Sequence, residues 1–160
     1  MIQKQELLTF LKKEYATTVK VLQAYPEGKD DLKPHEKSSD ALKLAKTFVF
    51  EMYLTGAHVL GDAVDRTKFS SYDPGTVSKA LADFQKETDE IISRLETLPD
   101  EDFQKEIEFA GKKFIAGNFL HMMICDQIHH RGQMTVYIRL AGGLVPSIYG
   151  PSADDTSTNL

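Results

Sequence analysis

The chain has 160 residues, 41% of them hydrophobic, which suits one domain (1–160) with a single core. Its formal net charge is −5 at pH 7, and Lys and Arg are scattered among Asp and Glu, so no continuous basic surface is available to bind nucleic acid. No run of about 18 uncharged apolar residues occurs, so we expect no membrane-spanning helix.

The cysteine content and the N-terminal sequence indicate the cellular compartment. Cys125 is the only cysteine and therefore has no partner for an internal disulfide. The N-terminal MIQKQELLTF has neither the basic region nor the purely apolar region of a secretory signal. We therefore expect a reducing cytoplasm.

The first predicted helix runs from Ile2 to about Ala24. Apolar residues recur there at steps of three and four until Pro26 and Gly28 end the pattern. These residues are Leu8, Leu11, Tyr15, Val19 and Leu22. Residues 26–39 (PEGKDDLKPHEKSS) are charged, contain two prolines and show no period, which predicts a long surface connection.

The second predicted helix begins at a cap formed by Ser39 or Asp40 and runs to about Val64. Its apolar stripe is Ala41, Leu44, Phe48, Met52 and Val59. A neighbouring stripe holds Thr47, Glu51, Thr55 and His58. We expect Thr55 and His58 to face solvent, whereas Thr47 and Glu51 lie within LAKTFVFEMYL, which is apolar enough to be buried on most sides.

A linker over residues 65–75 leads to the third predicted helix, from Val77 to Leu98, which has the clearest apolar stripe of the chain. Residues 101–117 are mixed, and we predict no regular strand there beyond a short extended excursion. The fourth predicted helix covers the stretch 118–143, and prolines and glycine make 143–160 an irregular tail. Four long helices joined by long connections predict an all-α four-helix bundle with at least one crossing connection.

Polar side chains interrupt the expected core stripe of the fourth helix. Phe119, Met122, Tyr137 and Leu140 share that stripe with Asp126, His130 and Gln133. Asp126 and His130 stand four residues apart, so both project from one face. Such a pair binds one side of a divalent metal when another helix supplies the remaining ligands, or it forms a hydrogen-bonded structural pair between helices.

A second array has the same spacing. His121, Cys125 and His129 are good zinc ligands, but a lone cysteine is more often a small core residue. Cys125 would act as a nucleophile only if it were exposed beside a positive group.

Two further residues on this helix break the apolar pattern. We expect Arg131 to hold a neighbouring helix, or the tail through a carboxylate such as Asp154 or Asp155. Gly132 costs about 1 kcal/mol relative to alanine in a helix, and close approach of another helix or of a second subunit would account for it.

The runs DQIHHRGQ (126–133), VYIR (136–139) and VPSIYGPSAD (145–154) resemble the C-terminal signature of the DinB/YfiT-like family. The resemblance covers the chain in helix order. It implies a bacterial damage- or stress-inducible protein with a four-helix bundle of up-down-down-up connectivity. It further implies a homodimer and a divalent metal (Zn, Ni or Mn) held between helices two and four.

Three histidines usually bind that metal in the family. The last of them matches His130, the one four residues earlier is Asp126 here, and the helix-two position, aligned through LAKTFVFE, is Thr47. Glu51, one turn further along, is the available replacement ligand. With two imidazoles missing, the resemblance leaves open a metal held by Asp126, His130 and Glu51, or a pocket that has lost its metal.

Characterised relatives of this kind resemble metal-dependent transferases or isomerases that use low-molecular-weight thiols such as bacillithiol or mycothiol. The implied activity is thus a thiol transferase or hydrolase, with Gln133 or Tyr137 orienting the substrate and Thr47 lining the pocket. The alternative is a non-catalytic dimeric protein that binds a small apolar ligand and in which Asp126 and His130 are only a structural pair.

Overall fold

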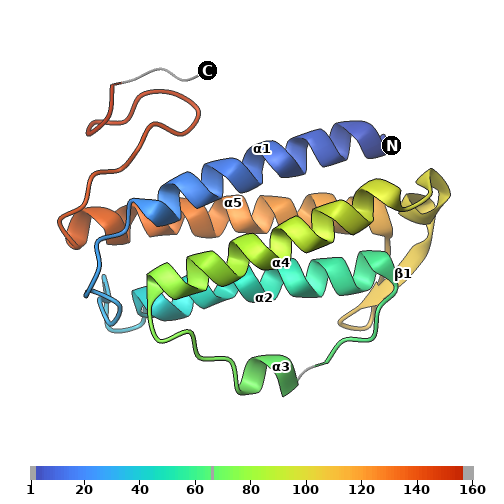
Figure 1. Cartoon of the computed structure of the whole chain (residues 1–160), viewed down its shortest axis with the longest axis horizontal. Helices are drawn as coiled ribbons and strands as arrows, with labels where there is room; N and C mark the ends of the chain where they lie inside the picture. Colours follow the sequence, from blue (N-terminus) through green and yellow to red (C-terminus); the bar gives the residue numbers. More distant parts are fainter. Residues whose placement is uncertain (1–2, 66, 157–160) are drawn as a thin grey trace.

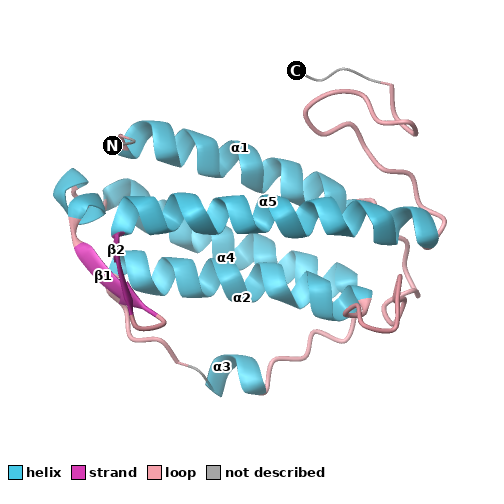
Figure 2. Ribbon diagram, turned by 180° about the vertical axis from the view of Figure 1, so that it is seen from behind, coloured by secondary structure: helices cyan, strands magenta, loops and turns pink. Residues whose placement is uncertain are grey.

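Four long helices form most of the molecule. The structure, a computed structural model, describes residues 3–65 and 67–156. The long helices are α1 (Lys4–Gln23), α2 (Ala41–Leu60), α4 (Val77–Thr97) and α5 (Ala116–Leu140), and the short α3 (Thr67–Ser70) lies between α2 and α4 (Figure 1). A 3₁₀ helix (Asp100–Gln104) and the strands β1 (Glu106–Phe109) and β2 (Lys112–Ile115) precede α5 (Figure 2). The predicted all-α class is confirmed.

Local signals set the helix ends. Asp40 accepts a hydrogen bond from the Lys43 backbone N–H at 2.7 Å and caps α2, as its position predicts. The same helix ends at Leu60, earlier than the predicted Val64, because Gly61 adopts the left-handed conformation (φ 75°) that terminates helices. Ile2, where the first helix was expected to start, lies outside the described residues, and α1 is described from Lys4.

The segment before α5 corrects the sequence prediction, because it contains an antiparallel hairpin. Phe109 pairs with Lys112 across a two-residue turn in which Ala110 (φ 51°) and Gly111 (φ 74°) are both left-handed. The Phe109 and Phe114 rings pack on Phe119 at 5.0 and 5.7 Å between centroids. Strands this short carry too little alternation to be recognised in sequence, and Ala110 is an unusual residue at this turn position.

Contacts between named side chains give the helix directions. Lys4 at the start of α1 donates a hydrogen bond to the Glu96 carbonyl near the end of α4, so these helices are antiparallel. The Tyr137 hydroxyl near the end of α5 donates to the Ser39 carbonyl just before α2, so α2 and α5 are antiparallel as well. Each of α1 and α2 packs against both α4 and α5. Figure 1 shows the result: α1 and α5 run one way, and α2 and α4 the other.

The buried face of α5 differs from the predicted stripe. Met122 and Leu140 are exposed (39% and 56%), and so are Asp126 and Gln133. The stripe that enters the core is Leu120, Met123, Ile124, Gln127, Arg131, Met134 and Ile138, almost all of it buried. Apolar residues occur on every side of this helix, so periodicity alone does not identify the buried face. None of the helices within residues 3–65 and 67–156 combines the length and apolar character needed to cross a membrane.

Arg131 lies in the core and joins three parts of the chain. Its guanidinium group donates to the Glu14 carboxylate of α1 at 2.7 Å and to the Tyr149 hydroxyl of the tail. Tyr149 in turn donates to Glu14 at 2.6 Å. The expected role in holding a helix is therefore correct, whereas Asp154 and Asp155 are the wrong partners. Asp154 pairs instead with Arg139 at 2.9 Å, because the tail turns back along the end of α5.

Candidate metal centre

Three side chains of α2 and α5 converge where these helices run antiparallel. Glu51 projects from α2, and Asp126 and His130 project from successive turns of α5. His130 Nε2 lies 3.0 Å from Glu51 Oε1 and 3.9 Å from Asp126 Oδ1. Each residue offers one ligand atom, and all three atoms lie within 4.8 Å of one another. The structure therefore brings together the three residues that the sequence predicts as metal ligands.

Glu51 provides the buried side of this cluster. Its side chain is 8% exposed, against 21% for His130 and 50% for Asp126. Burial raises the pKa of the Glu51 carboxyl from 4.5 to about 8, and the negative charge of Asp126 and a shared hydrogen bond with it add to the shift. Two carboxyl groups share a hydrogen bond only when one of them holds a proton. Without that proton Glu51 Oε2 is a buried oxygen with no donor within the described residues, and a cation would satisfy it.

Gln133 fixes the orientation of the His130 ring. The Gln133 amide nitrogen contacts His129 Nε2 at 3.0 Å, which leaves its oxygen to face His130 Nδ1, also at 3.0 Å. An amide oxygen only accepts, so Nδ1 carries the proton and donates it. In the neutral ring Nε2 then holds a lone pair directed at Glu51 and Asp126, which is the tautomer a metal ligand needs.

The donor set fits a divalent cation. Carboxylate oxygens and a neutral imidazole nitrogen are ligands shared by Zn, Ni and Mn sites. Because Asp126 is half exposed, the cluster is open on one side, where a substrate atom can approach. The protein would thus hold a cation through Glu51, Asp126 and His130.

A cavity of about 480 Å³ opens beside His130. Its walls include Thr47, Gln133 and Tyr137, the three residues predicted as pocket residues. Two of their hydroxyls are already engaged: Thr47 donates to the Lys43 carbonyl at 3.1 Å, and Tyr137 to the Ser39 carbonyl at 2.7 Å. Tyr137 therefore shapes the cavity by fastening the connection 26–39 against α5.

Two members of the polar stripe on α2 do not face solvent as expected. Thr55 is 2% exposed, and its hydroxyl donates to the Glu51 carbonyl at 2.6 Å. His58 is half-buried, with its ring edge-on to Phe109 at 5.2 Å. The hairpin missed in the sequence covers His58, and a threonine hydroxyl bonded to the preceding turn needs no water.

The second array of candidate ligands does not converge. His121 packs against the Phe10 ring at 5.8 Å, Cys125 is exposed, and His129 contacts Gln133. Within residues 3–65 and 67–156, the group with three converging ligand atoms is Glu51, Asp126 and His130. Cys125 is also not the small core residue that the simpler interpretation favoured.

The connection 26–39 was predicted only as a surface connection and not as part of the site. Pro34, Lys37 and Ser38 nevertheless line the cavity beside His130. Their only sequence signal is proximity to the cap of α2, which places them at the end of that helix where Thr47 lies. A long charged connection with no period does not reveal which surface it covers.

Comparison with known proteins agrees with this fold. The sequence profile of the DinB family matches residues 1–159, and the chain belongs to the DinB family. The resemblance seen in the C-terminal signature is thereby confirmed. The chain is also 37% identical over 86 residues to the uncharacterized protein YrdA of Bacillus subtilis strain 168, and this match spans 52% of each chain.

Two solved structures share the fold. A DinB-like protein from Bacillus cereus ATCC 10987 is similar with a TM-score of 0.80 and 23% identity, covering 91% of this chain and 97% of that one. The DinB-like protein YjoA from Bacillus subtilis gives a TM-score of 0.69 and 22% identity, covering 86% and 92% of the two chains. At this identity the likeness concerns the fold alone.

Proposed function

We propose that this DinB-family protein is a metal-dependent enzyme that transfers a low-molecular-weight thiol to an electrophile or hydrolyses a small substrate. The observation that supports the proposal is the convergence of Glu51, Asp126 and His130, with the His130 lone pair held toward the two carboxyl groups by Gln133. A divalent cation bound by these residues supplies a Lewis acid that lowers the pKa of a thiol or of water.

The residues around the cluster have distinct parts in this proposal. Asp126 is on the open side, where its exposed carboxylate is available to bind the cation and to accept a proton from the approaching substrate. Glu51 would hold the cation from the buried side of the cluster as a carboxylate. The cavity beside His130 receives the substrate, with Thr47 and Gln133 in its wall.

The second candidate is a non-catalytic protein that has lost its metal and binds a small ligand. The direct 3.0 Å contact between His130 and Glu51 favours it, because a neutral Glu51 satisfies the imidazole by donating its proton to Nε2. In that case the pair only holds α2 and α5 together.

Metal analysis of protein purified without a histidine tag separates the two. We expect about one Zn, Ni or Mn ion per chain, lost in Asp126→Ala and in His130→Ala, and a melting temperature that rises when the ion is added back. His35→Ala, at an exposed position in the connection, is the control and should keep the metal. Metal-free protein whose melting temperature ignores all three ions supports the second candidate.

Activity is measured on the metal-loaded chain with a low-molecular-weight thiol and an alkylating electrophile. We expect consumption of the thiol to fall at least a hundredfold in His130→Ala, because outer-shell changes alone already cost about 10- to 100-fold in metal affinity or activity. Equal rates in the native and variant proteins contradict the transferase.

We also propose, as the sequence predicts, that the protein has a role under stress, is located in the cytoplasm and forms a homodimer. For the dimer, a Cβ added at Gly132 would meet nothing within 4 Å among the described residues outside its own helix, so the close approach expected there does not come from a neighbouring helix. Gly132 lies on an exposed face of α5 with Met122, Val136 and Leu140, which suits a second copy of the chain.

A further inference from the structure

A second cavity, of about 680 Å³, lies beside the C-terminal half of α2. α2, the linker that carries α3, and the β hairpin enclose it, and Figure 1 shows α3 and the hairpin beside α2. Its volume falls in the range of small-molecule sites, about 300–1,000 Å³. Its lining residues are Phe50, Leu54, His58, Val64, Phe69, Glu108, Phe109, Ala110 and Gly111. None of them belongs to the metal cluster or to the cavity beside His130.

Aromatic rings form much of the wall. Phe50 on α2 meets Phe69 on α3 edge-on, with 4.5 Å between ring centroids. On the opposite side, His58 meets Phe109 of the hairpin edge-on at 5.2 Å. Phe50 is 38% exposed. Its aromatic ring, a group that is usually buried, therefore faces the open cavity. Rings of this kind favour a flat aromatic ligand that stacks or packs edge-on against them.

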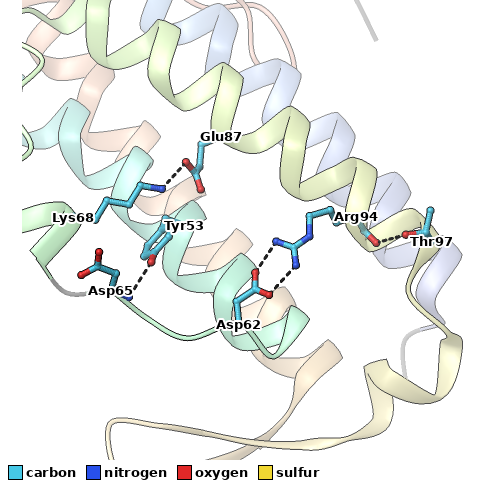
Figure 3. Close-up of polar contacts among 7 residues, drawn as sticks. All are labelled: Tyr53, Asp62, Asp65, Lys68, Glu87, Arg94 and Thr97. Atoms are coloured by element: carbon cyan, nitrogen blue, oxygen red, sulfur yellow. Dashed lines mark hydrogen bonds and ion pairs between the residues drawn. The ribbon is translucent and has the colours of Figure 1, made fainter.

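The linker that closes the cavity is fastened at several points. Arg94 of α4 binds the Asp62 carboxylate through two hydrogen bonds of 2.6 and 2.8 Å, and the Tyr53 hydroxyl accepts from the Asp65 backbone at 2.9 Å (Figure 3). Lys68 of α3 pairs with Glu87 at 3.2 Å and lies 4.1 Å above the Tyr53 ring (Figure 3). The wall is therefore formed before any ligand enters, which lowers the entropic cost of binding.

The polar groups of the wall are acceptors. His58 Nδ1 lies 2.7 Å from the Leu54 carbonyl, which only accepts, so Nδ1 carries a proton and Nε2 of the neutral ring has a free lone pair. Glu108 is the other polar side chain of the wall, and its carboxylate has no hydrogen-bond or ion-pair partner among the described residues. The remaining lining side chains carry no polar atom. A ligand that forms a hydrogen bond with either of these two side chains must bring a donor.

We propose that this cavity binds a small planar aromatic molecule with an N–H or O–H donor, of the indole or phenol type. The donor binds His58 Nε2 or Glu108, and the ring packs between Phe50, Phe69 and Phe109. This site is separate from the proposed metal-dependent activity and does not rest on it.

Indole is a suitable probe because the chain contains no Trp, so indole fluorescence excited beyond the tyrosine absorption band is free of protein signal. The titration with the probes is carried out at about pH 8. The native protein should then bind indole saturably, with a blue shift of the emission. It should bind 1-methylindole, which lacks the donor, about five- to tenfold more weakly, the factor expected from one hydrogen bond.

Two variants place the probe in the cavity. His58→Phe keeps an aromatic ring and removes the acceptor, so the preference for indole over 1-methylindole should fall to less than twofold. Phe69→Leu, in the exposed α3, removes a ring of the wall and should weaken both probes by a similar factor. His35→Phe makes the same chemical change as His58→Phe outside the cavity and should behave as the native protein.

Absence of saturable indole binding to the native chain overturns the proposal, and so does equal affinity for the two probes. A preference that survives in His58→Phe also overturns it, unless Glu108→Met, which leaves no acceptor oxygen at this position, removes the preference, in which case the donor binds Glu108. Because the first two outcomes are measured on the native protein with both probes, they do not depend on the folding of any variant.

Discussion

At the scale of single residues, the fold raises the pKa of the Glu51 carboxyl group. Its pKa in the folded, metal-free chain is about 8, against an ordinary 4.5, because it is buried and lies beside Asp126. A carboxyl with a raised folded pKa binds its proton more tightly in the folded than in the unfolded chain. The resulting stability is fully present below about pH 4.5 and is lost as the pH rises through about 8.

The variant Glu51→Gln tests this directly, because glutamine does not ionise. We expect the free energy of unfolding of the metal-free native protein to fall by about 1–3 kcal/mol relative to Glu51→Gln between about pH 6 and pH 9. Urea unfolding in the presence of a chelator measures it. Glu90→Gln on the exposed side of α4 should show no such divergence. Parallel pH profiles for the native protein and Glu51→Gln would mean that Glu51 is ionised and stabilised without a metal.

At the scale of helices, a buried ion pair joins α1, α5 and the tail. Arg131 is 1% exposed and Glu14 4%, and Tyr149 bonds to both. Removing one charge of such a pair leaves the other without its counterpart in the core, which costs more than the pair itself contributes. Arg131→Met should therefore destabilise the chain by about 3–5 kcal/mol in urea unfolding.

The double variant Arg131→Met with Glu14→Leu is the informative comparison. It should regain part of that loss, since no unpaired charge remains in the core. The matched control is Arg139→Met, which breaks the half-exposed pair with Asp154 and should cost less than about 1 kcal/mol. A double variant as unstable as the sum of the single variants would show that the two side chains do not act as a pair.

At the scale of the whole molecule, the exposed face of α5 is the feature left without a partner in the described chain. Met122, Cys125, His129, Gly132, Val136 and Leu140 follow one another on it at helical steps. Val136 and Leu140 are 50% and 56% exposed, and contiguous exposed apolar side chains mark interaction sites. A second copy packed on this face would also approach the open side of Asp126.

The double variant Val136→Glu with Leu140→Glu should convert a dimer into a monomer, because it places like charges on both sides of such an interface. Sedimentation equilibrium gives the mass. Ala82→Glu, at an exposed position of α4, should leave the mass unchanged. A native protein that is monomeric at micromolar concentration rules out this interface.

The sequence by itself determined the features that depend on neighbouring residues. Helical periodicity, the Asp40 cap and the breaks at Pro26 and Pro99 define the four long helices, since these signals act within a few residues. The four-residue spacing of Asp126 and His130 likewise guarantees that they share a face, whatever surrounds them.

Only the tertiary structure decided which faces meet. It brought Glu51, which the sequence offered only as a replacement ligand, to Asp126 and His130. It also selected Glu14 and Tyr149 as the partners of Arg131 and the stripe through Gln127 as the buried side of α5. It also revealed the hairpin that covers His58. The physical reason is that the rotation of one helix against another is set by the packing of all side chains between them. The sequence of a helix with apolar residues on every side does not indicate which of its faces is buried.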